Sequence, residues 1–254
     1  MNNQNKDTRP LGLTDEQPSG DVHELHFNES RSFDVPRGYD YRRTSALADT
    51  GSAVLRTALN PILQIIDRVF LGYSVSGTEN FDRVSGGAVT IANHIHPLDC
   101  TMVDLALFPH RAYYVTLESN FRIPVVRSLI KWLRAVPMSR RPARMGEMFA
   151  EMSKALAEGS FVHFYPEAVL KPYCTELREF HDGAFRLAVK SRVPVVPMYL
   201  SQSAPAGLSC YKHKPCLRLE VLSPVYPDLT LSLKQSVEKL KTECRKAMTD
   251  AASK

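Results

Sequence analysis

The 254-residue sequence lacks several features that mark particular classes of protein. Its five cysteines are odd in number and include no C-x-x-C pair, which argues against both a secreted disulfide framework and a zinc ribbon. The longest uncharged run, Val193 to Tyr211, contains three prolines and does not read as a membrane-spanning helix. No apolar run follows Met1, so no secretory signal peptide is predicted, and we expect a cytoplasmic protein.

No phosphate-binding loop of the G-x-x-x-x-G-K type and no RNA-binding strand motif occurs, so nucleic acid is not an expected partner. What the sequence does have is an ordinary globular composition, with 44% hydrophobic and 23% charged residues and a net charge of +5. Between Arg111 and Met145 there are eight Lys or Arg residues and one acid. This basic stretch, which includes Trp132, suits either a surface of anionic lipid or a solvated helix face packed on a sheet.

Composition divides the chain at about residue 43. Residues 1–43 contain 10 apolar and 14 charged residues, too few apolar groups to offset the entropy of ordering, so a disordered segment is predicted. Residues 44–254 are expected to form one domain, with an amphipathic helical segment over 44–73 and an α/β core over 74–254. In the helical segment, apolar residues recur at helical spacing from Val54 to Phe70. They indicate either a helix packed in the core or one lying on a membrane surface.

From residue 88 onward, strand and helix patterns alternate along the chain. This alternation predicts an α/β fold, a single layered domain with a mostly parallel central sheet flanked by helices. The expected strands are 88–92, 112–117, 136–138, 161–165, 195–200 and 217–222, and the expected helices are 98–107, 124–134, 142–158, 183–190 and 232–252.

Reactive side chains follow three of the expected strands. His94 and Asp99 come after 88–92, Arg140 after 136–138, and Glu167 after 161–165. Ligands of parallel sheets bind at the carboxyl ends of the strands, so these side chains are candidates for one site. If the chain turns at Pro97, the Asp99 carboxylate can accept a proton from one ring nitrogen of His94 and leave the other as a base. The alternative is a structural histidine beside an aspartate at a helix start.

Six segments follow one another along the chain, each similar to a short motif: Val75–Phe81 (V-x-G-x-E-N-L), Asn93–Asp99 (N-H-x-S-x-x-D), Leu133–Arg140 (L-G-A-I-P-V-D-R), Phe164–Glu167 (F-P-E-G), Phe180–Ala184 (F-K-x-G-A) and Val193–Pro197 (V-P-I-V-P). Through these motifs, in this order, the sequence resembles the glycerolipid acyltransferases, typified by 1-acylglycerol-3-phosphate acyltransferase, from about Ser74 to Tyr199.

The resemblance implies a role for each candidate residue. His94 would be the general base of acyl transfer and Asp99 its orienting carboxylate. Arg140 and Glu167 would bind the glycerol-phosphate part of the acceptor, and Asn93, at the head of the first motif, joins them as a substrate-binding residue. A planar, permanently charged arginine suits a phosphate group.

The sequence departs from the family pattern at several positions. His96 replaces the usual Ser, Arg134 and Ala168 replace glycines, and His181 replaces a Lys. The third motif also lacks its T-R-S continuation, and Lys171 is a candidate substitute for the missing arginine as a phosphate contact, or else a solvated loop lysine.

The resemblance therefore implies an enzyme, an O-acyltransferase of phospholipid biosynthesis that lies peripherally on the cytoplasmic face of a membrane. It would move a fatty acyl group from acyl-CoA or acyl carrier protein to a lysophospholipid hydroxyl, with lysophosphatidic acid as the leading acceptor and no cofactor or metal. Two alternatives stay open: a non-catalytic, membrane-associated relative, and a metal-dependent hydrolase that uses His94 and His96.

Overall fold

The computed structural model describes residues 33–122, 124–174, 176–205 and 209–253. Among these residues, seven strands form one sheet: β1 (Ser74–Ser76), β2 (Ala88–Ala92), β3 (Ala112–Leu117), β4 (Ala135–Met138), β5 (Phe161–Phe164), β6 (Val195–Ser203) and β7 (Cys216–Val221). Six α-helices accompany them: α1 (Ala46–Ile66), α2 (Asp99–Leu107), α3 (Pro124–Trp132), α4 (Pro142–Ala157), α5 (Gly183–Ser191) and α6 (Leu233–Ala252). Three short helical turns complete the set: η1 (Asp67–Leu71), η2 (Thr78–Arg83) and η3 (Glu118–Phe121).

The sheet is mostly parallel, which confirms the predicted fold class. Its strand order is β1-β7-β6-β2-β5-β3-β4, and only the pair β6–β7 is antiparallel. All six predicted strands and all five predicted helices form, with ends that shift by a few residues; the three-residue strand β1 was not predicted. Because β2 lies in the middle of the sheet, between β5 and β6, its carboxyl end is flanked by two other strand ends.

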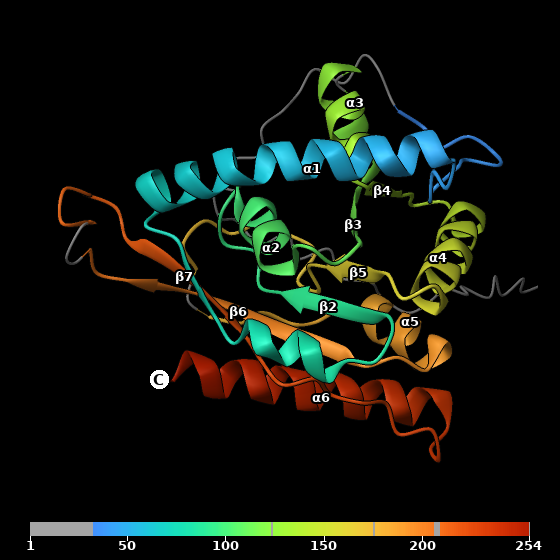
Figure 1. Ribbon diagram of the computed structural model, residues 1–254. Helices are drawn as coiled ribbons and strands as arrows, with labels where there is room; N and C mark the ends of the chain where they lie inside the picture. Colours follow the sequence, from blue (N-terminus) through green and yellow to red (C-terminus); the bar gives the residue numbers. More distant parts are fainter. Residues whose placement is uncertain (1–32, 123, 175, 206–208, 254) are drawn as a thin grey trace, which may run out of the picture. The chain divides into compact units, whose positions relative to one another are not determined.

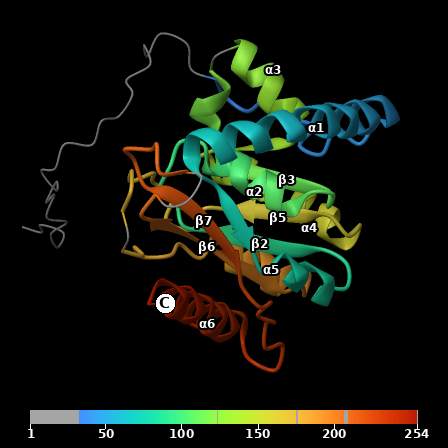
Figure 2. The same ribbon diagram turned by 60° about the vertical axis from the view of Figure 1, so that its left-hand side comes forward.

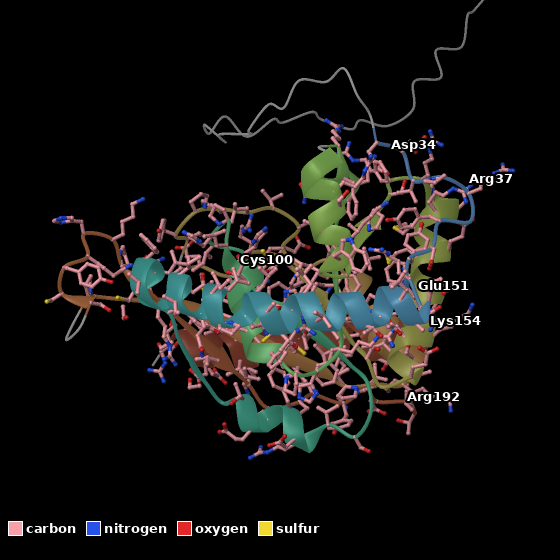
Figure 3. All side chains as sticks on the ribbon, turned by 45° about the horizontal axis from the view of Figure 1, so that its top comes forward. Asp34, Arg37, Cys100, Glu151, Lys154 and Arg192 are labelled. Carbon is pink, nitrogen blue, oxygen red and sulfur yellow. The ribbon has the colours of Figure 1, made fainter. Side chains whose placement is uncertain are left out.

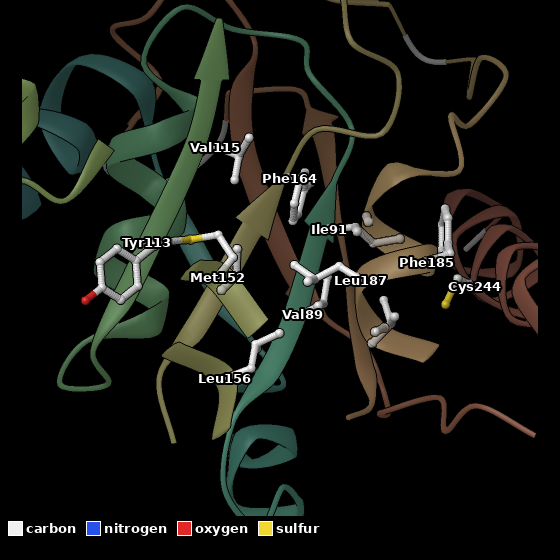
Figure 4. Packing of buried hydrophobic residues seen from close by; sticks show 14 of the residues in the cluster. Val89, Ile91, Tyr113, Val115, Met152, Leu156, Phe164, Phe185, Leu187 and Cys244 are labelled. Atoms are coloured by element: carbon white, nitrogen blue, oxygen red, sulfur yellow. The ribbon is translucent and has the colours of Figure 1, made fainter. Parts of the chain in front are cut away.

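Helices cover both faces of the sheet in the unit Ser32–Lys254 (Figures 1 and 2). On one face, α4, α5 and α6 pack against strand side chains that point toward them, such as Val89 and Ile91 of β2. Met152 and Phe185 fill the layer between these helices and the sheet (Figure 4). On the other face, α2 packs on the sheet. Since side chains alternate along a strand, β2 supplies Val89 and Ile91 to one layer and Ala88 and Ala92 to the other, which explains why this central strand is almost continuously apolar.

The helix α1 lies outside α2 and turns its polar side inward. Ser45 caps its start by accepting the Ala48 N–H at 3.2 Å. Its buried positions recur every four residues and are mainly polar: Ala48, Ser52, Arg56 and Asn60. Leu71 at the end of η1 is buried, but seven large apolar side chains of α1 and η1 are exposed: Leu47, Val54, Ile62, Ile65, Ile66, Val69 and Phe70.

Buried ion pairing holds this inward polar face in place. Arg56 pairs with Asp104 of α2 at 2.8 Å and donates to the His110 carbonyl at 2.9 Å. In η1, Asp67 accepts the Thr101 hydroxyl at 2.8 Å. Of the two alternatives for this helix, packing in the core is therefore wrong for the exposed apolar residues, because the side of α1 that pairs with α2 is the polar one.

Residues 33–43 also differ from the expectation of disorder through residue 43. Val35 and Tyr41 are buried in the core, and Arg42 pairs with Glu151 of α4 at 2.9 Å. Figure 3 shows the start of this segment, marked by Asp34 and Arg37, together with Glu151 on α4. Two buried side chains and this ion pair order the segment, so the boundary lies earlier than residue 43; residues 1–32 fall outside the described part.

Candidate active site

His94 and Asp99 meet at the carboxyl end of β2. The chain turns after Ala92, and α2 begins at Asp99 itself. This turn closes the five-residue spacing that a continuous helix would keep apart, and it sets His94 Nδ1 2.7 Å from Asp99 Oδ2. The Asp99 side chain is buried, and Oδ2 also accepts the Ile95 N–H at 3.2 Å. A carboxylate at the first position of a helix is further stabilised by the helix dipole.

The hydrogen bond fixes which ring nitrogen of His94 can act as a base. An ionised carboxylate only accepts hydrogen bonds, so Nδ1 carries the proton and Nε2 presents a lone pair. Among the described residues, no hydrogen bond engages Nε2. The His94 side chain is 23% exposed, so this nitrogen can reach a bound molecule.

Tyr165, which directly follows β5, stacks on the His94 ring. The two ring centroids lie 4.1 Å apart with an angle of 17° between the planes. His163 of β5 lies edge-on to Tyr165 at 4.6 Å and bonds Thr90 through Nδ1 at 3.0 Å. Burial, with a smaller effect of His94, lowers the pKa of His163 to about 3, so this ring is neutral. Tyr165 was not among the predicted site residues, although it lies inside the third motif.

Glu167 is held by an arginine that the sequence analysis missed. The Glu167 side chain is buried, and it accepts Arg178 Nη2 at 2.7 Å and the Arg178 backbone N–H at 3.1 Å. Glu167 Oε2 also accepts the His94 backbone N–H at 3.4 Å. Glu167 thus links Arg178 to the loop of His94. Arg178 lies beyond the third motif, and no local spacing signal marks it.

The loop after Glu167 is bonded to the loop after β2. The Lys171 N–H donates to the His94 carbonyl at 3.1 Å, and the Tyr173 N–H donates to the Ile95 carbonyl at 2.9 Å. The Lys171 side chain itself is exposed. The structure therefore brings four of the predicted site residues into one connected unit: His94, Asp99, Glu167 and Lys171.

Asn93 and Arg140 occupy different surroundings. The Asn93 amide is buried and exchanges two hydrogen bonds with the Leu200 backbone, at 2.8 Å and 2.7 Å, which ties the end of β2 to β6. Arg140 is exposed just beyond the end of β4, three strand positions from β2. At about 4.8 Å per strand, the two strand ends are roughly 14 Å apart, so Arg140 is not in contact with His94.

The metal-site alternative has little support from the donor geometry. In the described ranges, no three His, Cys, Asp or Glu side chains gather in a way that could hold a metal ion. His96 accepts the Leu98 N–H at its Nδ1, 3.1 Å away, and its ring lies edge-on to Tyr173. The Nδ1 atoms of His94 and His96 are thus both engaged in hydrogen bonds within the protein.

Comparison with known proteins places this site in a family. A family model described as "Acyltransferase" matches residues 72–201, about half of the chain. The chain belongs to the acyltransferase family. The matched region contains β2, α2 and β5, and therefore His94, Asp99 and Glu167.

Curated relatives in this family are named 1-acyl-sn-glycerol-3-phosphate acyltransferases. A chloroplastic one from Brassica napus is 26% identical over 163 residues, which covers 62% of this chain and 46% of the relative. One from Chlamydomonas reinhardtii is 30% identical over 133 residues, covering 52% and 39% respectively. The chain thus spans less than half the length of these relatives.

The fold of this acyltransferase is also similar to a solved structure. The 1-acyl-sn-glycerophosphate (LPA) acyltransferase PlsC from Thermotoga maritima superposes with a TM-score of 0.56 and 16% identity. The match covers 82% of this chain and 84% of the other, which shows a shared fold.

Two departures from the family's glycines lie at left-handed backbone positions. Arg134 has φ = 61° and Ala168 has φ = 60°, a region that glycine adopts freely and L-residues adopt at a cost of about 1–2 kcal/mol. Arg134 gains compensating contacts, because its buried guanidinium lies 3.0 Å from Asp49 of α1 and above the Tyr113 ring. The exposed Ala168 gains no such contact among the described residues.

Proposed function

We propose that this chain transfers a fatty acyl group from a thioester, acyl-CoA or acyl carrier protein, to the hydroxyl of a lysophospholipid, with lysophosphatidic acid as the leading acceptor. The observation that carries the proposal is the His94–Asp99 pair at the carboxyl end of β2, with Nε2 unengaged among the described residues. The names of the curated relatives support the same acceptor class.

In this reaction, His94 Nε2 takes the proton of the acceptor hydroxyl as its oxygen attacks the thioester carbonyl. The imidazolium that forms is stabilised by the buried Asp99 carboxylate, 2.7 Å from Nδ1. The tetrahedral intermediate then breaks its carbon–sulfur bond, and the leaving thiolate takes the proton back from Nε2. The acyl group ends on the acceptor, and His94 returns to its starting state without a covalent enzyme intermediate.

The acceptor phosphate has three candidate cations at this edge of the sheet. Arg140 is exposed beyond β4, and Lys171 is exposed in the loop bonded to His94. Arg178 is partly exposed and is held by Glu167. Glu167 joins the acceptor-binding set through this pairing, because it orients Arg178 while fixing the His94 backbone. The distance of roughly 14 Å between the ends of β2 and β4 leaves room for a glycerol-phosphate group.

The outer face of α1 and η1 is the candidate membrane-docking surface, defined by Leu47, Val54, Ile62, Ile65, Ile66, Val69 and Phe70. Monomeric soluble proteins rarely expose so many large apolar groups together, and a helix of this kind suits the boundary between lipid headgroups and acyl chains. In the described part of the chain, no helix is both long and apolar enough to cross a bilayer. A helix docked on the bilayer surface is the form of membrane contact we propose.

Basic and aromatic groups border this surface at the η1 end. In the connection between β6 and β7, Tyr211 and Lys212 donate hydrogen bonds to the Val69 and Phe70 carbonyls. Burial lowers the pKa of His96 against the opposing charge of Asp99, and the charges of Lys214 and Lys212 lower it further. Asp67 of η1 accepts the Thr101 hydroxyl at 2.8 Å, two residues along α2 from Asp99, so the membrane-docking surface borders the helix that carries Asp99, and we propose that an acceptor held in a bilayer reaches His94 from this side.

The test is acyl transfer by the purified full chain, read by mass spectrometry. The chain is given an acyl-CoA and vesicles that carry a panel of lysophospholipids, and acyl carrier protein is tried as the second donor. We expect acylation of lysophosphatidic acid, and we expect His94→Ala to reduce turnover at least about a hundredfold while the fold is retained.

A matched pair of aspartate variants sharpens this test. Asp99→Asn keeps the shape but takes away the charge that fixes the His94 tautomer, and turnover should fall roughly a thousandfold or more. Asp228→Asn, which alters an exposed ion pair with Lys239 before α6, should leave transfer unchanged. Absence of transfer with every acceptor and both donors would instead favour the non-catalytic, membrane-associated relative.

A further inference from the structure

Tyr165 contacts the proposed catalytic histidine directly, which its position in the third motif does not indicate. Its ring lies flat on the His94 ring, with centroids 4.1 Å apart. The other restraint on the imidazole is the hydrogen bond from Nδ1 to Asp99. The ring of His94 is thus held from its edge by Asp99 and from its face by Tyr165, which together leave one orientation for Nε2.

Buried polar atoms without hydrogen bonds gather around this stack. Within the described part of the chain, the Tyr165 hydroxyl, Asp99 Oδ1 and His163 Nε2 are buried and have no partner that meets hydrogen-bond geometry. An unsatisfied buried polar group is expensive, so three together at one point call for a functional account. Burial and the nearby Asp99 carboxylate both raise the pKa of the Tyr165 phenol, which therefore keeps its proton and can act as a donor.

We infer that Tyr165 is a positioning residue for the His94–Asp99 pair: its ring supports the His94 imidazolium, and its hydroxyl donates to the free oxygen Oδ1 of Asp99. This inference rests on the proposed role of His94 as a base. It concerns how that base is held and how strongly it binds a proton.

The two contacts of Tyr165 act on His94 in opposite directions. An aromatic face attracts a cation, so the stacked ring favours protonated His94 and raises its proton affinity. A hydroxyl that donates to Asp99 draws electron density from the carboxylate, which weakens the pull of Asp99 on the imidazolium and lowers the proton affinity. The other titratable groups that face His94 are His96 on its own loop, His163 on β5, and Glu167 with its partner Arg178.

Two variants separate the contacts. Tyr165→Phe keeps the ring and removes the hydroxyl, and we expect the proton affinity of His94 to rise about threefold. Tyr165→Leu removes both, and because the ring touches the imidazolium directly whereas the hydroxyl acts on it only through Asp99, we expect the affinity to fall about threefold to tenfold. In the acyl-transfer assay, Tyr165→Leu should lower kcat about tenfold and leave the KM of the acceptor unchanged.

The primary measurement is the NMR titration of the histidine ring signals in the full-length protein, with His94 assigned through its loss in His94→Ala. This titration requires no turnover, so it tests the inference even if the proposed function fails. Tyr73→Phe is the matched control, since Tyr73 is also buried and donates one hydrogen bond, to the Met102 carbonyl at 2.9 Å. It should not move the His94 titration.

The outcomes are distinct. A His94 titration that moves upward in Tyr165→Phe and downward in Tyr165→Leu supports the inference. A His94 titration in Tyr165→Leu that coincides with that in Tyr165→Phe overturns the stacking role, because the two variants differ only in the aromatic ring. One that stays in place in Tyr165→Phe overturns the hydroxyl's role, and because that variant changes a single atom, loss of folding cannot obscure the result.

Discussion

Removing apolar groups from the membrane-docking surface should weaken vesicle binding without unfolding the protein. The sharpest change is the double variant Ile65→Ser/Phe70→Ser, because these side chains are 65% and 70% exposed. Neither contributes much to the core, so the free energy of unfolding should change by less than about 0.5 kcal/mol. Any loss of binding then reports on the surface itself.

The size of the effect follows from the exposed fractions. Full transfer of an Ile or Phe side chain out of water is worth about 1.5–3 kcal/mol. About two thirds of each side chain is available to lipid, so each contributes roughly 1–2 kcal/mol if it enters the bilayer. Since about 1.4 kcal/mol corresponds to a factor of ten, each single variant should bind vesicles about tenfold more weakly, and the double variant about a hundredfold.

The assay is co-sedimentation of the full chain with sucrose-loaded vesicles that contain about one third anionic phospholipid. The control is Leu229→Ser, which removes a side chain of similar exposure, 54%, from the turn before α6. Figure 1 shows α6 and α1 on opposite sides of the sheet, so this control should bind like the unmodified protein. If the double variant binds as tightly as the control, the apolar face of α1 and η1 is not the membrane contact.

Three further predictions concern stability. Ala168→Gly should raise the free energy of unfolding in urea by roughly 1 kcal/mol, because φ is 60° there, whereas Ala150→Gly in the exposed middle of α4 should lower it by a similar amount; equal signs would refute the strain argument. Arg178→Met should lower it by about 2 kcal/mol, since the buried Glu167 carboxylate loses its cation, and an unchanged urea midpoint would contradict this. Burial lowers the pKa of His163 to about 3, below the value of about 6.5 in an unfolded chain, so falling pH favours the unfolded state. The contribution of neutral His163 to the free energy of unfolding should be fully present above pH 6.5 and about 2 kcal/mol smaller at pH 5. His163→Leu should flatten this pH dependence, and an equal slope in the variant would refute the argument.

The order of strands and helices was predictable from local patterns. Continuous apolar runs such as Val89–Ala92 and helical spacings such as those of α4 persist because each strand and helix buries its own side chains. The candidate site was predictable from the same local patterns, since His94, Asp99 and Glu167 come shortly after β2 and β5, which are neighbouring strands. The three-residue strand β1 is too short to leave a periodic signal.

The partners of those site residues were not predictable. Arg178 reaches Glu167 from eleven residues away, across a loop with no regular spacing, and Tyr165 meets His94 only because β5 pairs with β2. Such contacts depend on how strands are ordered in space, which no local motif encodes. The sequence did mark Ala168 and Arg134 as departures from glycine, but only the backbone angles explain why glycine suits those positions.

The orientation of α1 shows most clearly what the sequence determines by itself and what depends on the tertiary structure. The sequence by itself determined that residues 44–73 form a helix with an apolar and a polar side, because spacing alone sets which residues share a face. It did not determine which side faces the protein. The tertiary structure decides which side faces inward, because α2 and the residues after it provide buried partners for the polar side. Arg56 pairs with Asp104 and the His110 carbonyl, and Asp67 accepts the Thr101 hydroxyl. The structure pairs those charges inside, since a buried charge without a partner is costly, and leaves apolar side chains of α1 and η1 exposed.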